Sequence, residues 1–397
     1  MFRFNQRAER LIRLAAPFGF YGWGNIGDEA TLAGFAALLK TSEVSLFAWI
    51  GSRNWRHTTK VEPAFHYFSA GGLDPRRWWA KRTADVQAVV GGTPVMDVLG
   101  EWPLCDVARL VCNAVEKRRV PFVCVGVGIE GLRSPESIRI VREVLAPRVL
   151  HWSVRTKRDR DRLVGYGVGT DQVTVAADMA WLIEPADQEF GRQQFKKWGL
   201  DQVPVVIGIN LVNENAVLDR HPAMADAIAG ALDRWVEDFD ARLLFLANEV
   251  RDGDGFDTAA AQRIIARLKH PEHAFLAPVE YLAPREMMSI VRCCRFTLSM
   301  RYHFCIFSAL EGVPFVAIER ADKVSDLCWD LNWEYRVVPP DIVMEDLFQK
   351  GKAAIMNREA LADRLHAEAA KMRIRAKLNL TPLQMVGIKG EEIVDSI

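Results

Sequence analysis

The sequence lacks several features that mark whole classes of protein. It has no charge excess, because 51 Lys and Arg residues balance 51 Asp and Glu residues, and this argues against a general binder of nucleic acids or membrane surfaces. No apolar run reaches the roughly 18 residues of a membrane span, and the N-terminal residues lack the apolar stretch of a signal peptide. We therefore expect a cytoplasmic globular protein, in which a local basic pocket is still allowed.

The seven cysteines offer neither a disulfide framework nor a zinc site. Their number is odd, no C-x-x-C pair occurs, and several lie in apolar runs. Such cysteines are typical of buried free thiols in a reducing compartment. A zinc site would need closely spaced Cys and His ligands, and we expect no metal.

Arginines gather near the start of the chain, at positions 3, 7, 10 and 13, which is helical spacing. This pattern fits either a weak basic face toward a membrane or partner, or a solvated first helix, which is the reading we favour. The first alternative would make the protein a peripheral protein at the inner face of the membrane.

Length and apolar patterning predict two α/β domains. A chain of 397 residues is too long for one ordinary core. Longer amphipathic stretches alternate with short apolar runs at 11–18, 44–49, 86–90, 122–127, 151–154 and 173–176. After a polar stretch the alternation restarts, with apolar runs at 205–211, 243–247, 274–276, 296–299 and 314–318. Strands that alternate with helices indicate parallel sheets, so we expect two Rossmann-like domains, residues 1–188 and 189–397, the second ending in a helix.

A glycine-rich turn follows the first predicted strand. Glycines at 19, 22, 24 and 27 precede a helix that begins near Asp28. Glycines let backbone amides approach a ligand, and a helix N-terminus favours anions. The spacing is not G-x-G-x-x-G, so a dinucleotide fingerprint is not indicated. Asp28 and Glu29 either cap the helix and match its dipole or bind a ligand, and Asn25 bonds either the loop itself or a sugar hydroxyl.

Two further strand ends carry candidate residues. Gly91 and Gly92 end the run at 86–90, and ligands of open α/β sheets bind beyond the carboxyl ends of strands; tight backbone geometry alone would also explain this pair. Arg155 follows the run at 151–154, where its planar guanidinium suits a carboxylate or a phosphate. An ion pair at the domain interface is the alternative for Arg155.

The most informative motif is Ser299-x-Arg301-x-His303. It lies where the run at 296–299 passes into an apolar helix, and anionic ligands dock at such junctions. We favour a functional role over a histidine satisfied in the core. Lys323, near the start of a later helix, either reaches a phosphate held at this junction or is a plain surface lysine.

Taken in order, these motifs resemble the polysaccharide pyruvyl transferase family. The N-terminal loop matches its signature through Tyr21, Gly22, Asn25, Gly27, Asp28 and Glu29. The later matches are Gly91-Gly92 with Asp97, Ser153-Val154-Arg155, Asp178, Ser299, Arg301, His303 and Gly312-Val313-Pro314. Two positions depart from the family pattern: Thr93 stands where a third glycine is common, and Tyr302 where leucine is usual.

The resemblance implies two Rossmann-like domains facing across a cleft, similar to the GT-B glycosyltransferases. It implies transfer of pyruvate as a ketal from phosphoenolpyruvate to a saccharide, free or lipid-linked, in exopolysaccharide synthesis. Phosphoenolpyruvate is then a co-substrate, and no metal or other cofactor is expected. The rival activities are a nucleotide-sugar glycosyltransferase of similar fold and a non-catalytic glycan- or anion-binding protein.

Under this hypothesis the candidate residues fall into three sets. His303 and Arg301 are the expected catalytic residues. The donor is expected to contact Arg155, Arg301, Lys323 and Ser299, on the C-terminal domain except for Arg155. The acceptor is expected to contact the N-terminal domain through Asn25, Asp28, Glu29, Gly91 and Gly92.

Overall fold

The computed structural model describes residues 11–40, 42, 44–50, 65–69, 75–251 and 253–389. By their internal contacts these residues form two compact units. The first unit holds the residues up to Trp23, those from Asp28 to Ile183, and those from Met372 onward. The second unit holds Gly24–Gly27 and Glu184–Lys371. Of the N-terminal arginines, Arg13 is described, and those at 3, 7 and 10 lie outside the described residues.

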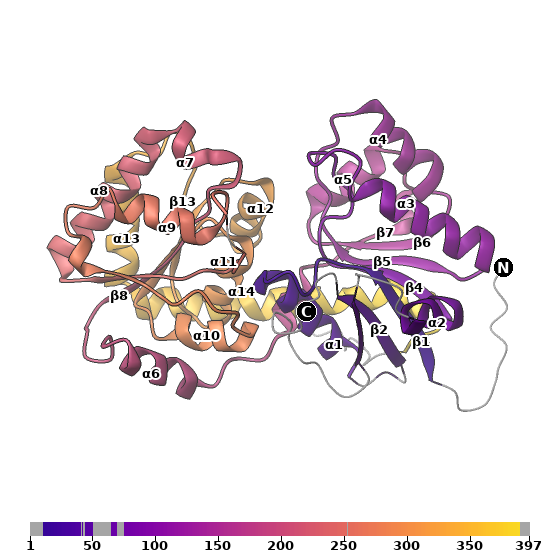
Figure 1. The fold of residues 1–397 in the computed structure, drawn as a ribbon, viewed down its shortest axis with the longest axis horizontal. Helices are drawn as coiled ribbons and strands as arrows, with labels where there is room; N and C mark the ends of the chain where they lie inside the picture. Colours follow the sequence, from indigo (N-terminus) through magenta and orange to yellow (C-terminus); the bar gives the residue numbers. More distant parts are fainter. Residues whose placement is uncertain are drawn as a thin grey trace. The chain divides into compact units, whose positions relative to one another are not determined.

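A seven-stranded sheet, parallel throughout, forms the centre of the first unit, with helices on both faces (Figure 1). Its strand order is β3-β2-β1-β4-β5-β6-β7. The strands are β1 (Ile12–Phe18), β2 (Val44–Ile50), β3 (Phe65–Ser69), β4 (Val86–Val90), β5 (Phe122–Val127), β6 (Val149–Val154) and β7 (Val173–Val175). The central strands β4 and β5 are buried at every residue, which is why they are continuous apolar runs without alternation.

Local signals set the helices of the first unit. The helices are α1 (Ile26–Leu38), α2 (Pro75–Thr83), α3 (Leu104–Cys112), α4 (Pro135–Ile140), α5 (Lys157–Gly165) and α15 (Thr381–Gln384). Thr156 and Asp159 form a capping box at the start of α5, which satisfies two backbone N–H groups that the helix leaves without partners. Ser134 caps α4 in a similar way by accepting from the N–H of Glu136.

The C-terminal segment belongs to the first unit, and the predicted assignment of the whole segment to the second domain is wrong. Helix α14 (Arg358–Lys377) begins in the second unit and ends in the first. Beyond it, Leu380 and Leu383 join the buried core on one face of the seven-stranded sheet. The Nδ2 of Asn379 donates to the carbonyl of Ala177 at 2.8 Å. These buried contacts hold the segment in the first unit.

A six-stranded parallel sheet forms the centre of the second unit, in the order β10-β9-β8-β11-β12-β13. The strands are β8 (Val206–Asn210), β9 (Arg242–Phe245), β10 (Ala274–Leu276), β11 (Phe296–Ser299), β12 (Phe315–Ile318) and β13 (Arg336–Val337). The remaining helices are α6 (Gln188–Lys197), α7 (Val217–Arg220), α8 (Pro222–Phe239), α9 (Asp257–Ile265), α10 (Pro284–Arg292), α11 (Tyr302–Leu310), α12 (Asp322–Asp330) and α13 (Met344–Met356). Helix α11 is largely apolar, and eight of its nine residues are buried, as expected of a helix enclosed in a core.

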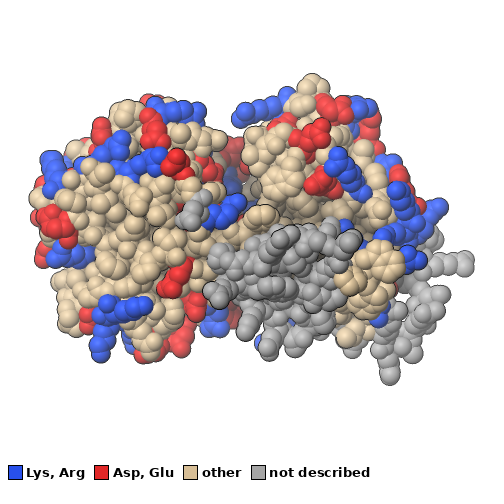
Figure 2. All heavy atoms as spheres, in the orientation of Figure 1, with Lys and Arg blue, Asp and Glu red and all other residues tan. Residues whose placement is uncertain are grey.

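The distribution of charged side chains and the state of the cysteines agree with what the composition predicts. Basic and acidic side chains are interspersed over the visible face of each unit (Figure 2). All seven cysteines are free, and four of them are buried, which confirms the predicted free thiols. Among the described residues, no helix combines the length and apolar character needed to cross a bilayer, and no three His, Cys, Asp or Glu side chains group as a metal site.

Candidate active site

The Ser299–His303 motif lies at the topological switch point of the second unit. Strand β8 has β9 on one side and β11 on the other, so the strand order runs in opposite directions from this point. Asn210 at the end of β8 pairs in register with Ser299 at the end of β11. In open α/β sheets, ligands bind in the crevice beyond the carboxyl ends of the strands at such a point. The fold therefore places this motif where a ligand is expected.

Ser299 shapes the junction between β11 and α11. Its side chain is fully buried, and its Oγ accepts the backbone N–H of Arg301 at 2.9 Å. A side chain that bonds the backbone two residues on stabilises a tight turn. Helix α11 begins directly after this turn, at Tyr302. Ser299 thus positions the backbone of Arg301, and its direct contact with the donor stays a prediction.

Asp257, the first residue of α9, orients the Arg301 guanidinium. Its Oδ1 accepts from Arg301 Nε at 3.0 Å and Nη2 at 2.5 Å, and Asp257 is only 2% exposed. Its Oδ2 accepts from the Asn210 Nδ2 and from the backbone N–H of Asn248, both at 2.9 Å. Burial alone would lower the pKa of Arg301, but the carboxylates of Asp257 and Glu214 outweigh it and raise that pKa. Arg301 is therefore a fixed, permanent cation.

Glu214 lies among three basic side chains. Its Oε1 accepts from Arg301 Nη1 at 3.2 Å, and its Oε2 lies 2.7 Å from Arg320 Nη1. Burial pushes the pKa of Glu214 up, but the charges of Arg320, Arg301 and Lys323 outweigh burial and lower it. Burial lowers the pKa of Arg320, and the nearby charge of Arg301 lowers it further, against the raising effect of Glu214. Two guanidinium groups and one ammonium group thus act on one carboxylate.

His303, in the first turn of α11, is covered by the glycine-rich loop. A Cβ on Gly27 would lie 2.2 Å from His303 Nδ1, so only glycine permits this approach. The Asn25 Oδ1 holds the loop, since it accepts from the Gly27 N–H at 2.9 Å and from Asn248 Nδ2 at 3.3 Å. The loop role that the sequence allowed for Asn25 is thus the one observed. Residues 24–27 consequently join the ends of β9 and β11 within the second unit.

Arg155 forms a buried ion pair inside the first unit. Its Nε lies 2.9 Å from the Asp178 Oδ2 and also donates to the Gly126 carbonyl at 3.0 Å. The exposed fractions of the two side chains are 5% and 0%. The sequence allowed either a ligand contact or an ion pair at a domain interface for Arg155, and the partner observed in the ion pair belongs to the same unit. Asp178 also accepts from the Thr31 hydroxyl at 3.2 Å, so it anchors α1 as well.

The glycine pair after β4 adopts a left-handed backbone. Gly91 and Gly92 have φ values of 64° and 68°, a region that glycine enters without steric cost. A Cβ on Gly91 would meet the Thr31 side chain at 2.3 Å, and one on Gly92 would meet the Phe20 ring at 2.5 Å. Tight packing therefore requires both glycines, which was the structural alternative for this pair.

The two acidic residues of the loop differ in their surroundings. Glu29 is fully buried, and its Oε1 accepts the Gly22 N–H at 2.6 Å. Glu29 therefore holds the glycine-rich loop to α1, which favours its structural role over contact with an acceptor. Asp28 is half-buried in the first turn of the same helix. Burial, together with the charges of Asp28 and Glu29, raises the pKa of Tyr21, whose hydroxyl donates to the Val90 carbonyl.

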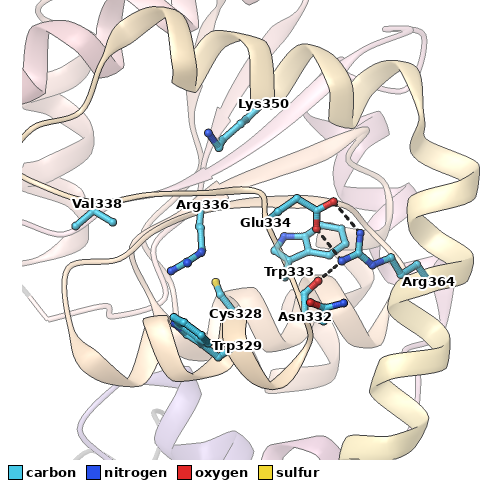
Figure 3. A pocket seen from close by; sticks show the side chains of 9 residues that line it. All are labelled: Cys328, Trp329, Asn332, Trp333, Glu334, Arg336, Val338, Lys350 and Arg364. Carbon is cyan, nitrogen blue, oxygen red and sulfur yellow. Dashed lines mark hydrogen bonds and ion pairs between the residues drawn. The ribbon is translucent and has the colours of Figure 1, made fainter.

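A cavity of about 830 Å³ opens elsewhere on the second unit (Figure 3). It is lined by Cys328, Trp329, Asn332, Trp333, Glu334, Arg336, Val338, Lys350 and Arg364. Arg364 in this cavity is paired with Glu334 at 2.7 Å, and Arg336 is paired with Glu319 at 2.5 Å. None of the lining residues belongs to the Arg301 cluster, so this cavity is separate from the candidate site.

Sequence reasoning missed the residues that complete the cluster. Asn248 comes directly after the predicted run at 243–247, so a polar residue at a strand end was visible there, whereas Asn210 is the last residue of β8 and lies inside the predicted run at 205–211. Asp257 comes after a glycine-rich turn at the start of a helix, which reads locally as a cap. Glu214 and Arg320 have no local signal, because their roles arise from contact with Arg301 and with each other.

The chain is similar in structure to several solved glycosyltransferases and epimerases. Anabaena HepE in complex with UDP-glucose matches at TM-score 0.60 and 12% identity, over 94% of this chain and 97% of that one. A glycosyltransferase from Rickettsia africae matches at 0.59 and 11% identity, over 97% and 98%. The UDP-GlcNAc 2-epimerase from Neisseria meningitidis, bound to UDP-GlcNAc, matches at 0.55 and 9% identity, over 94% and 98%. These matches confirm the predicted fold class of two Rossmann-like domains.

Sequence comparison is more specific. None of the curated proteins matches the chain by sequence. The sequence profile of the polysaccharide pyruvyl transferase family, in contrast, matches residues 25–322. That range runs from Asn25 in the glycine-rich loop through the Arg301–His303 junction. The chain therefore belongs to the polysaccharide pyruvyl transferase family.

Proposed function

We propose that this protein transfers a pyruvyl group from phosphoenolpyruvate to two hydroxyls of a saccharide, which gives a ketal and inorganic phosphate. The observation that carries this proposal is the Arg301 cluster at the switch point of the second unit, in a chain of this family. Phosphoenolpyruvate carries a phosphate and a carboxylate, so it needs several cations close together. Arg301, Arg320 and Lys323 supply three of them around one point.

The donor would lie at the N-terminus of α11. Arg301 is already fixed by Asp257, so its Nη1 edge is held in place for an anion with little loss of side-chain entropy. The first backbone N–H groups of α11 add the positive end of the helix dipole, which would stabilise the departing phosphate. Arg155 stays a proposed second anion contact, on the first unit at the ends of β4 and β5.

His303 would carry the proton transfers. In the first step its imidazolium donates a proton to the methylene carbon of phosphoenolpyruvate, and a sugar hydroxyl attacks the adjacent carbon. The resulting imidazole takes the proton of that hydroxyl. The second hydroxyl then closes the ketal as the C–O bond to phosphate breaks, and its proton leaves with the phosphate. Each bond formed is thereby matched by one broken, and no oxidant or further co-substrate is needed.

The acceptor is assigned to the first unit. Asp28, half-buried at the start of α1, and the backbone at Gly91 and Gly92 are the proposed contacts there. Glu29 and Asn25 would act indirectly, because both hold the glycine-rich loop. A saccharide in exopolysaccharide synthesis, free or lipid-linked, is the proposed acceptor class.

The structural relatives point to a second candidate, a glycosyltransferase that uses a nucleotide sugar. HepE was crystallised with UDP-glucose, but at 12% identity it shares the fold alone. The two activities differ in the co-substrate consumed. Phosphate release from phosphoenolpyruvate, dependent on a saccharide mixture, would support pyruvyl transfer, whereas release of UDP from UDP-glucose would support the alternative.

Replacement of the proposed proton carrier tests the mechanism. His303→Ala is expected to lower phosphate release by about 10²–10⁴-fold, the usual contribution of general acid–base catalysis, while circular dichroism stays that of the wild type. His270→Ala is the matched control, since His270 lies partly exposed beside Glu237, outside the cluster. Near wild-type turnover in His303→Ala would remove this residue from the mechanism.

A further inference from the structure

Glu214 occupies a position that an anionic ligand would fill. It is the carboxylate that joins the two guanidinium groups, with Arg301 on one oxygen and Arg320 on the other. Its partners differ sharply in exposure from Glu214 itself: the Arg301 and Arg320 side chains are 9% and 16% exposed, whereas Glu214 is 39% exposed. A carboxylate that is open to solvent can leave, while the cations that it neutralises stay in place.

We propose that Glu214 is a displaceable internal counter-ion of the anion site, and that Arg320 is a further donor-binding residue once Glu214 has moved. This inference rests on the proposed function for the identity of the donor. The anion enters where the Glu214 carboxylate lies, and its oxygens take over the hydrogen bonds from Arg301 Nη1 and Arg320 Nη1. The site then selects ligands with enough negative charge to displace a carboxylate held by two arginines.

The geometry of Arg320 supports a role beyond its pairing with Glu214. Its Nε is buried and has no hydrogen-bond partner within the described residues. A buried donor without a partner is costly, so a site that keeps one is suited to a ligand that supplies an acceptor. An anion with several oxygens, such as a phosphate, can accept from more than one edge of the guanidinium.

Glu214 is flanked by a fixed residue on one side and by left-handed backbone on the other. Asn213 is buried and fixed, because its Nδ2 donates to Asp219 at 2.9 Å and its Oδ1 accepts the Leu218 N–H at 2.9 Å. Between these anchors, Asn215 and Ala216 have φ values of 56° and 53°. Two successive non-glycine residues in the left-handed region are strained, and such strain collects in segments that switch. Glu214 therefore lies between the fixed residue Asn213 and the strained pair Asn215 and Ala216.

The charges around Arg301 give the reason why the Glu214 carboxylate would move when an anion binds. Asp257 already neutralises Arg301 from the opposite edge of the guanidinium. With Glu214 in place, a phosphate would meet a second carboxylate at the same point and would be repelled. With Glu214 displaced, Arg320 and Lys323 are released to neutralise the ligand. In the absence of ligand, Glu214 supplies the counter-charge of Arg320, which otherwise lies beside the like charge of Arg301.

Titration of inorganic phosphate into the full chain by calorimetry tests this inference without any turnover. Glu214→Gln is expected to bind phosphate about tenfold more tightly, the effect of one partly screened like charge removed from the site. Arg320→Gln is expected to bind about tenfold more weakly, and Arg320→Lys to recover part of the loss. Glu345→Gln is the matched control, because Glu345 pairs with Arg234 on an exposed surface; it is expected to bind as the wild type does.

The outcomes separate this inference from the proposed activity. Tighter phosphate binding by Glu214→Gln with weaker binding by Arg320→Gln supports the counter-ion, even if no pyruvyl transfer is found. Unchanged or weaker binding by Glu214→Gln, with wild-type circular dichroism, overturns it, even if pyruvyl transfer is found. Where Glu214→Gln does not fold, Arg320→Gln decides alone: wild-type phosphate affinity in that variant contradicts the inference. In turnover assays the KM for phosphoenolpyruvate should change, and that for the acceptor should not.

Discussion

Replacement of Asp257 by asparagine should destabilise the second unit and impair the anion site together. Asp257 carries five of the contacts that build the cluster: two from Arg301 and three from Asn210 and the backbone N–H groups of Asn248 and Glu249. Every one of these partners is a donor. An aspartate accepts from all five, whereas an asparagine has one acceptor oxygen and an amide group that donates.

The magnitude follows from this mismatch. If the amide oxygen of the variant accepts from the Asn248 and Glu249 N–H groups, its NH₂ group faces the Arg301 guanidinium, and two donors oppose each other. If the amide is flipped, the NH₂ group instead faces the Asn210 amide and the N–H groups of Asn248 and Glu249, which are also donors. Arg301 also loses its buried counter-charge, and removal of one partner of a buried ion pair costs about 3–5 kcal/mol. We expect Asp257→Asn to lower the free energy of unfolding by about that amount.

Urea unfolding of the intact chain, followed by tryptophan fluorescence and far-UV circular dichroism, measures the effect. Asp226→Asn is the matched control, because Asp226 pairs with Arg267 at 3.3 Å on the surface, with 68% of its side chain exposed, and exposed pairs contribute little. Asp257→Asn should also lose phosphate binding. A wild-type unfolding midpoint in Asp257→Asn would refute the assigned role of Asp257.

Three further predictions concern close packing and pH. Gly34→Ala places a Cβ 1.8 Å from the backbone carbonyl oxygen of Met179, and in urea unfolding it should destabilise the first unit by about 1–3 kcal/mol. Gly165→Ala is the control, because the space around Gly165 is open, and it should leave the stability close to that of the wild type. Gly27→Ala should fold but lose at least about tenfold in turnover, because its Cβ at 2.2 Å displaces the His303 ring; wild-type kcat would contradict the packing described. The basic neighbours outweigh burial and lower the pKa of Glu214, so its carboxylate contributes stability in full above the ordinary Glu pKa of about 4.3, and this contribution is lost as the pH falls through the lower folded-state pKa. The stability advantage of the wild type over Glu214→Gln should therefore shrink below that pH in urea melts, and an unchanged difference would argue against the lowered pKa.

The sequence predicted the central strands well because each is a local apolar run. Strands β4 and β5 coincide with the predicted runs at 86–90 and 122–127, and both are buried on two faces. Strand β13 was not predicted, because it is only two residues long and contains an arginine. The return of the C-terminal segment to the first unit was also missed. It depends on contacts such as Ser153 Oγ to Asn379 Oδ1 at 2.7 Å, between residues that no local pattern connects.

In the candidate site, too, the residues with a local sequence signal were predicted and those that depend on distant contacts were not. Ser299, Arg301 and His303 were found because they share one strand-to-helix junction within five residues of sequence. Asp257 and Glu214 were not found, because a carboxylate at a helix start or in a loop has the same local appearance whether it faces solvent or a buried guanidinium. Burial and partner decide its role, and both arise only when distant segments fold together.

The structure of the protein crystallised with phosphoenolpyruvate tests the central claim most directly. The donor phosphate is predicted to lie within hydrogen-bond distance of the Arg301 and Arg320 guanidinium groups, next to His303, with the Glu214 carboxylate moved away from both arginines. A donor bound elsewhere, with Glu214 still bridging the two arginines, would contradict the account.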